Sequence, residues 1–247
     1  MSYGGFGTLY NTIVGTWTPS YHTEEADTLA HWKFETLIAD DVVGTFDLNA
    51  GDSELRGPVG DGSKLGLVAR TFTYNNTADT ALSPNNNADF KYTFATAIYI
   101  PALATGNGDI VRYEQAAAGG VHFRVGVTGT ADAPNSGRLY VGRDTSAGYQ
   151  QALSPTAVFA PYFNEWVHFA WTQAADGLSG DIYINGVSVF SWSTANAPNS
   201  TDSLARFGLC ASWNQVLHGG CYFSPIVREK ECSAPEILAM AYQTGVV

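Results

Sequence analysis

Charge is scarce in this sequence, and positive charge is the scarcest. Charged residues make up 14% of the 247 residues, against about 25% in an average soluble domain. Lys and Arg number 12 against 23 Asp and Glu, which gives a formal net charge of −11. Nucleic acids and anionic membrane surfaces are bound through clustered Lys and Arg, so this balance argues against both as partners.

Long apolar runs and an export signal are also missing. No stretch of the sequence approaches the ~20 consecutive apolar residues that a membrane-spanning helix needs, so we expect no membrane insertion. Residues 1–17 lack both the basic start and the continuous apolar centre of a signal peptide. These absences predict a protein made in a cytoplasm, or released from the cell by lysis.

Cysteine is rare as well, and its three positions, Cys210, Cys221 and Cys232, lie near the C-terminal end. An odd number leaves at least one thiol free. Their spacing matches no zinc site. Reduced, buried thiols are the simplest interpretation, and a Cys210–Cys221 disulfide is the alternative.

The sequence is rich in the residues that build β-sheets. Hydrophobic residues reach 45% and aromatic residues 13%, enough to fill the space between two sheets. In residues 165–172, Val167, Phe169 and Trp171 lie on one face and Trp166, His168 and Ala170 on the other, and this alternation predicts a strand. Residues 181–184 and 187–192 predict two further strands, joined by Asn185-Gly186. An Asn-Gly pair between apolar strands favours a type I′ hairpin turn, because both residues tolerate a positive φ.

This central segment resembles a known family. The pattern W-x-H-x-A-x-T, a loop and D-x-Y-x-N-G-x-x-V is similar to the concanavalin A-like, laminin-G-like jelly roll. It is carried by Trp166, His168, Ala170, Thr172, Asp181, Tyr183, Asn185, Gly186 and Val189. The strand at 226–229 before Ser233, and the opening strand around Trp32, also resemble that family. The resemblance implies an all-β sandwich of two antiparallel sheets, and it extends over most of the chain. That fold carries lectins, glycosidases, adhesion modules and virion proteins, so the likeness alone does not assign a function.

We expect one jelly-roll domain at residues 29–247, preceded by an extended arm at residues 1–28. Further strands are predicted from turn signals about every dozen residues, at 65–74, 90–100, 109–114, 120–127, 138–143, 205–211 and 220–227. Residues 49–64 are predicted to be a loop. Ser233, followed three residues later by Glu236, is a capping box that predicts one short C-terminal helix. Ile237, Leu238 and Tyr242 are expected to dock this helix on the sandwich.

The arm is unusually aromatic for a terminal segment. Large apolar rings gain free energy by docking on a surface, on this subunit or on a neighbour. The candidate contact residues of such an assembly arm are Tyr3, Phe6, Tyr10, Trp17 and Tyr21.

Catalytic chemistry is only weakly indicated. Jelly-roll glucanases place paired carboxylates on one strand in the pattern E-x-D-x-x-E. The nearest match runs from Asp109 to Glu114 and has Val111 at the central position. Strict alternation puts its two carboxylates on opposite faces. We therefore expect a solvated strand end, no catalytic residues and no enzyme. The five histidines are scattered along the sequence, and His168 is expected to be structural.

Binding chemistry has two candidates. Lectin-like relatives hold calcium through loop carboxylates, and such a site here would use Asp40, Asp41, Asp47, Asp52 and Asp61. Loops rich in Asp are usually ordinary soluble turns, so we predict no cofactor, with calcium as the alternative. For sugar binding, the best candidate is Trp213 with Asn214, in a loop rich in Gly and His. Packing in the core or at an interface is the alternative role of Trp213.

Three functions are compatible with these features. The first is a non-enzymatic structural or decoration protein on the exterior of a virus particle, such as a tailed phage. It would form a homo-oligomer and bind the major capsid protein or other virion subunits. The second is a lectin-like receptor-recognition module that binds a cell-surface glycan. The third, disfavoured by the lack of paired carboxylates, is a glycoside hydrolase.

Overall fold

The computed structural model describes residues 20–33, 91–100, 105–115, 121–145, 147–196 and 221–247. It also describes the backbone of three short strands at 53–55, 67–69 and 205–208. Of residues 113–115, 121, 122 and 221–223 only the backbone is described. All structural statements below concern these residues.

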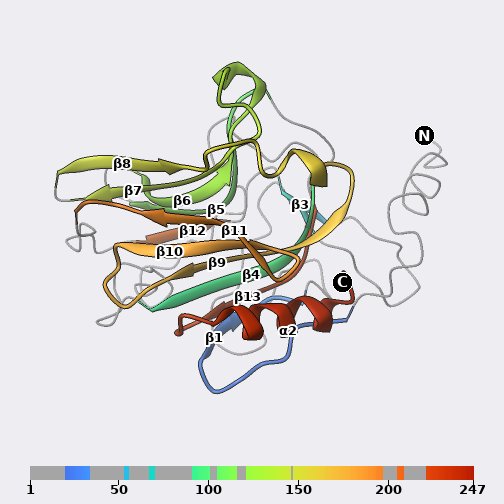
Figure 1. Cartoon of the computed structure of the whole chain (residues 1–247). Coiled ribbons are helices and arrows are strands. Elements are labelled where there is room, and N and C mark those ends of the chain that lie inside the picture. The colour runs from blue at the N-terminus through green and yellow to red at the C-terminus, as the bar shows by residue number, and fades with distance from the viewer. Residues whose placement is uncertain are drawn as a thin grey trace.

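Two antiparallel sheets stack face to face in the described part of the chain (Figure 1). A six-stranded sheet has the order β1-β13-β4-β9-β10-β11. Its strands are β1 (Thr28–His31), β13 (Cys221–Arg228), β4 (Tyr92–Tyr99), β9 (Trp166–Gln173), β10 (Ser179–Ile184) and β11 (Val187–Ser193). The sheet confirms the predicted strands at 90–100, 165–172, 181–184, 187–192 and 220–227.

The second sheet has five strands in the order β12-β5-β6-β7-β8. They are β12 (Ala205–Gly208), β5 (Gly108–Gln115), β6 (Val121–Val127), β7 (Leu139–Thr145) and β8 (Gly148–Leu153). A separate ladder pairs β2 (Ser53–Leu55) with β3 (Leu67–Ala69), and short 3-10 turns occur at Thr130–Asp132 and Ala160–Tyr162. The predicted antiparallel sandwich with a short C-terminal helix is therefore confirmed.

The main core lies between the sheets and follows from the alternation of side chains along each strand. On β9, Val167, Phe169 and Trp171 point inward, as the sequence predicts. Trp171 contacts Phe123 of the opposite sheet, with ring centroids 4.2 Å apart. The other large members are Trp32, Tyr92, Phe94, Ile98, Ile110, Val125, Leu139, Val141, Phe159, Ile182 and Trp192.

The hairpin between β10 and β11 has the predicted turn. Asn185 has φ 52° and Gly186 has φ 77°, both in the left-handed region that a type I′ turn requires. The turn is tied to β9, because the Asn185 side-chain oxygen accepts the N–H of His168 at 2.9 Å. A Cβ on Gly186 would lie 2.8 Å from the Cα of Leu238, so the C-terminal helix approaches the turn closely.

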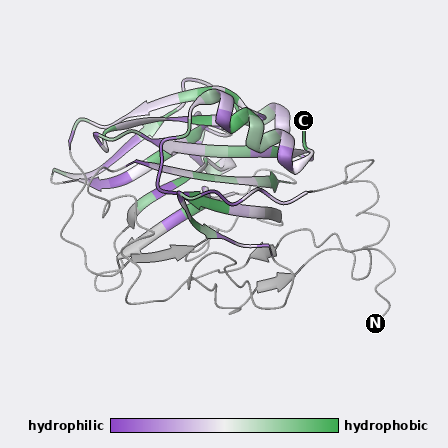
Figure 2. Cartoon of the chain, turned by 90° about the horizontal axis from the view of Figure 1, so that it is seen from below, coloured by the Kyte–Doolittle hydropathy of each residue, from purple (hydrophilic) through white to green (hydrophobic). Residues whose placement is uncertain are grey.

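That helix, α2 (Ala234–Thr244), covers the outer face of the six-stranded sheet (Figure 1). It begins at the predicted capping box, in which the Glu236 carboxylate accepts the Ser233 N–H at 2.8 Å. Ile237 and Met240 pack on Ala95, Ala170 and Ile226 in a second, smaller core. The expectation that Tyr242 docks the helix is wrong, since its side chain is 61% exposed. Figure 2 shows both apolar and polar positions along α2.

Two strands were not predicted. β8 has the sequence GYQQAL and is the last strand of its sheet. All its residues are exposed or half-buried, and its sequence lacks the apolar alternation that marks an inner strand. β2 lies in residues 49–64, which were expected to form a loop, and it is only three residues long.

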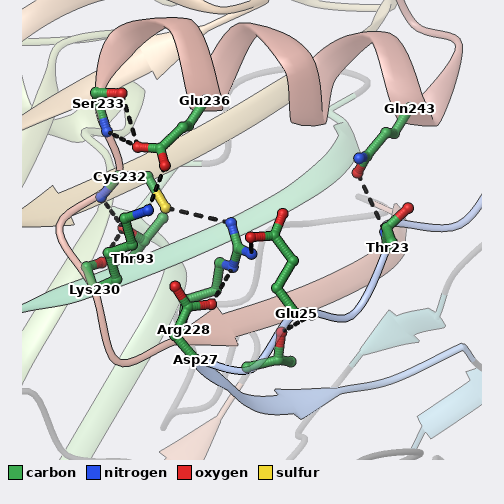
Figure 3. A network of polar contacts seen from close by, with 11 residues as sticks. Thr23, Glu25, Asp27, Thr93, Arg228, Lys230, Cys232, Ser233, Glu236 and Gln243 are labelled. Atoms are coloured by element: carbon green, nitrogen blue, oxygen red, sulfur yellow. Dashed lines mark hydrogen bonds and ion pairs between the residues drawn. The ribbon is translucent and has the colours of Figure 1, made fainter.

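The end of the expected arm contacts the sandwich. We call residues 20–27 the strap. It runs along the outer face of the six-stranded sheet and α2, where the Ser20 N–H donates to the Thr244 carbonyl at 3.4 Å. The Thr23 N–H donates to the Gln243 side chain at 3.2 Å (Figure 3). The first strand follows directly at Thr28. Residues 1–19 lie outside the described residues.

Candidate functional site

The two sheets differ in what covers their outer faces. In the described part of the chain, α2 and the strap lie on the six-stranded sheet, whereas the outer face of the five-stranded sheet carries charged and aromatic side chains, of which Asp109, Arg112 and Tyr140 are buried. We call five of these the Arg–Tyr cluster: Asp109 and Arg112 of β5, Arg124 of β6, Tyr140 of β7 and Tyr149 of β8. Arg124 lies between the inward-facing Phe123 and Val125, which places it on the outer face.

A bulge in β5 brings Asp109 and Arg112 together. The register of β5 against β6 shifts between Asp109 and Val111, so strict alternation does not hold there. An Arg112 guanidinium nitrogen lies 3.1 Å from the Asp109 carboxylate, and Arg124 Nε lies 3.1 Å from its other oxygen. Asp109 is fully buried, so the expected solvated strand end is wrong. The burial of Asp109 could not be predicted from the local sequence, because its partners come from β6 and β7 as well as β5.

Two tyrosines extend across the sheet over glycines. A Cβ on Gly126 would lie 2.8 Å from the Tyr140 ring, and a Cβ on Gly142 would lie 2.7 Å from the Tyr149 ring. Glycine at both positions therefore makes room for each ring to lean over the neighbouring strand. The Tyr140 hydroxyl donates to Asp109. The Arg124 guanidinium lies over the Tyr140 ring, 4.7 Å from its centroid, in a cation–π arrangement.

The electrostatics of the Arg–Tyr cluster hold both arginines in place. Burial raises the pKa of the Asp109 carboxyl, while Arg124, Tyr140 and Arg112 act against that rise. Burial also raises the pKa of Tyr140 well above its ordinary value, so its hydroxyl remains a hydrogen-bond donor. The cluster is thus a fixed arrangement of guanidinium donors in which Tyr149 is the exposed aromatic member, at 46%.

Most of the site residues expected from the sequence are not part of the Arg–Tyr cluster. Trp213 and Asn214, the expected sugar contacts, fall outside the described residues. So do four of the expected arm contacts, Tyr3, Phe6, Tyr10 and Trp17, and the aspartates of the alternative calcium site, Asp40, Asp41, Asp47, Asp52 and Asp61. The side chain of Glu114 also lies outside them. The fifth arm residue, Tyr21, is half-buried on its own subunit, where its ring centroid lies 6.4 Å from that of His31.

The thiol of Cys232 is free and buried, as expected of a reduced thiol. An Arg228 guanidinium nitrogen lies 3.7 Å from its sulfur (Figure 3). Burial raises the pKa of this thiol, which keeps it unreactive. The side chains of Cys210 and Cys221 lie outside the described residues.

A second polar cluster lies under the strap on the other sheet. Glu24, His31 and Ser224 are linked in the order of a hydrolase triad. The Ser224 Oγ lies 2.7 Å from His31 Nε2, and His31 Nδ1 lies 2.7 Å from Glu24. Ser224 and His31 are both fully buried. A nucleophile must reach its substrate, and the Ser224 Oγ already accepts the His22 N–H at 2.9 Å. We therefore assign these three residues a structural role.

In the described part of the chain, no three His, Cys, Asp or Glu side chains are placed to hold a metal ion. None of the helices described is long and apolar enough to cross a membrane.

Comparison with known proteins identifies the fold and no family. No known family model matches the sequence, and no curated protein is similar to it at the sequence level. Among solved structures, Trypanosoma rangeli sialidase bound to sialic acid is similar, with a TM-score of 0.64, 12% identity, and coverage of 97% of this chain and 38% of the sialidase.

Binding domains of bacterial toxins share the fold as well. The botulinum neurotoxin DC binding domain, in complex with rat synaptotagmin II, has a TM-score of 0.60 and 12% identity, covering 88% of this chain and 52% of that one. The botulinum neurotoxin serotype D ligand-binding domain, in complex with N-acetylneuraminic acid, has a TM-score of 0.60 and 11% identity, covering 87% and 50%. This chain thus spans between 38% and 52% of these neighbours.

Proposed function

We propose that this protein is a non-catalytic carbohydrate-binding module. Its glycan site, in this proposal, is the outer face of the five-stranded sheet around the Arg–Tyr cluster. The observation that carries the proposal is Tyr149, an aromatic side chain that is 46% exposed beside two fixed guanidinium groups.

The chemistry of this face suits a sugar. A tyrosine ring offers an apolar surface with a polar tip, which matches the C–H faces of a pyranose ring and its hydroxyls. Arginine provides several N–H donors in a planar fork, and sugar hydroxyls accept hydrogen bonds from such groups. Arg124 is held by Asp109 and its side chain is 12% exposed, so a ligand beside Tyr149 meets a donor that is already ordered, which lowers the entropic cost of binding. Arg112 is buried and holds Asp109 in turn.

The structural neighbours support the class of ligand and not its identity. The serotype D neurotoxin domain is seen with N-acetylneuraminic acid, and cell entry of botulinum neurotoxin type C depends on two ganglioside molecules. At 11% identity these proteins share the fold with this chain, which by itself permits many functions. The proposal therefore depends on the surface of this chain.

A glycan array followed by calorimetric titration tests the proposal. We expect binding of at least one glycan class, and a loss of affinity of about ten-fold or more in Tyr149→Ala, as for a central aromatic contact. The matched control is Tyr242→Ala, which removes a more exposed tyrosine from α2. If no glycan binds, the proposed function is wrong. If Tyr149→Ala and Tyr242→Ala bind equally, the site lies elsewhere, and Trp213→Ala tests the expected sugar contact.

The hypothesis of a virion decoration protein is a separate proposal. It depends on sequence features: the aromatic residues at 1–27, the low charge and the absence of paired carboxylates. It predicts that the chain is found in purified particles by mass spectrometry, associated with the capsid or with copies of itself. If the chain is absent from purified particles, the virion hypothesis is wrong and only the glycan-binding proposal is left.

A further inference from the structure

Three histidines from distant parts of the sequence meet under the strap. His22 belongs to the strap, His31 to β1 and His168 to β9, and their side chains are at most 2% exposed. His22 Nε2 lies 3.2 Å from His168 Nε2, and His22 Nδ1 lies 2.5 Å from the Ser224 carbonyl oxygen. Ser224 lies at a register shift of β13 with φ 53°, and this backbone conformation turns both its carbonyl and its hydroxyl toward His22.

The hydrogen bonds allow one arrangement of protons in which every histidine is neutral. The Ser224 carbonyl can only accept, so His22 Nδ1 carries a proton and its Nε2 is an acceptor. His168 Nε2 must then donate to His22 Nε2. On the other side, His31 Nδ1 donates to the Glu24 carboxylate, and His31 Nε2 accepts the Ser224 hydroxyl.

This arrangement has no place for an extra proton on His22 or His168. A second proton on His22 would set two N–H groups against each other across 3.2 Å. If His168 then changed tautomer, its proton would move to Nδ1, a buried atom with no hydrogen-bond partner. A buried donor left unpaired costs free energy.

No charged group described around the three histidines is free to stabilise a positive charge on His22 or His168. On the strap and β1, the Glu24 carboxylate is bound by His31 and by Lys33, at 2.9 Å from the Lys33 amine. On β13 the nearest charge is the Arg228 guanidinium, which repels a cation on His22 and is itself bound by Glu25 and Asp27 (Figure 3). The one charged residue of α2, Glu236, contacts Ser233 and Lys230. On the hairpin, Asp181 accepts hydrogen bonds from Ser188 and Ser191.

We propose that His22, Ser224 and His168 form an acid-sensitive latch, which holds the strap on the six-stranded sheet at neutral pH and releases it as the pH falls. Burial, with the nearby His168, lowers the pKa of His22 well below 6.5, and burial lowers the pKa of His168 to about 3. Once the strap opens, both imidazoles meet water and regain a pKa near 6.5. The open state therefore binds more protons than the closed state, and opening becomes more favourable as the pH falls from 6.5 toward 3.

Hydrogen exchange of the full-length protein at pH 7 and pH 5, followed by mass spectrometry, tests the latch. Labelling times are scaled for the intrinsic pH dependence of exchange. For each histidine that gains a proton on opening, the open population rises about 25-fold between these two pH values if its open-state pKa is about 6.5. We expect protection of residues 20–28 to fall at least ten-fold, and to stay below that of residues 166–184 at both pH values.

One variant and its control test whether His22 is responsible for the pH dependence. In His22→Gln, which removes the titrating group from the strap, we expect the pH-dependent fall in protection to shrink at least five-fold. The control His122→Gln removes a histidine from β6 of the other sheet and should behave as the wild type. The latch is wrong if strap protection in the wild type is independent of pH, or if it equals the protection of residues 166–184, because the strap would then open only by global unfolding. It is also wrong if His22→Gln keeps the wild-type fall. If that variant does not fold, the two wild-type comparisons still decide.

Discussion

The turn at Asn185-Gly186 permits a substitution test in which two costs can be separated. In Gly186→Ala the added methyl group meets a backbone at φ 77° and lies 2.8 Å from the Cα and 3.0 Å from the Cβ of Leu238. The left-handed backbone costs an L-residue about 1–2 kcal/mol. Overpacking adds about 1–3 kcal/mol, because the contact includes the backbone of α2 and the helix has to move. We expect the free energy of unfolding to fall by about 3 kcal/mol.

Gly148→Ala provides the matched control for this substitution. Gly148 also has a positive φ, 98°, but a Cβ there would meet nothing within 4 Å. That variant should show the backbone cost alone, about 1–2 kcal/mol. Urea denaturation followed by tryptophan fluorescence measures both. Equal losses in the two variants would show that α2 yields to the new methyl group without cost. An unchanged Gly186→Ala would refute the type I′ turn itself.

Two further predictions come from the structure and one from the sequence. Arg228→Met should lower the free energy of unfolding by about 2–4 kcal/mol in urea denaturation, because it leaves Asp27 and Glu25 without their buried cation. The control Glu25→Gln, at a half-exposed carboxylate, should lower it by less than about 1 kcal/mol. Equal losses in the two variants would contradict this prediction. The pKa of His168 is lower in the folded state, about 3 against 6.5, so the free energy of unfolding should decrease as the pH falls from 6.5 toward 3. For this residue the decrease from pH 7 to pH 5 should be about 2 kcal/mol. A urea midpoint that does not change with pH would contradict this prediction. The wild type should not hydrolyse a β-glucan panel, and Glu114→Gln should leave its thermal midpoint unchanged; hydrolysis that disappears in the variant would identify an enzyme.

The sequence alone predicted those elements of the fold that are specified by residues close together in the sequence. Asn185-Gly186 specifies its turn through backbone conformation, and the interval from Ser233 to Glu236 specifies the start of α2 through side-chain capping. The inward residues of β9 alternate over the whole strand. Each of these signals needs only neighbours within a few positions, which is why the sequence alone reveals them.

The candidate site depends on pairings that no local pattern encodes. The Arg–Tyr cluster requires a bulge in β5, a register between three strands and two glycines that make room for rings from the next strand. The histidines of the latch are separated by 146 positions between His22 and His168, and His22 lies 202 positions from Ser224. Their sequence neighbourhoods contain no metal or catalytic spacing, so the sequence suggested only scattered histidines.

The pairing of β1 with β13 has a consequence for how the protein is made. Thr28, Ala30 and His31 pair with Arg228, Val227 and Ile226, which the ribosome adds about 200 residues later. During synthesis β1 therefore waits without its partner until β13 has left the exit tunnel. Contacts of such high sequence separation make folding slow, because the long loop must close before they contribute. The sheet around β4, β9 and β10 can form before β13 is made, and β13 and β1 then complete it together.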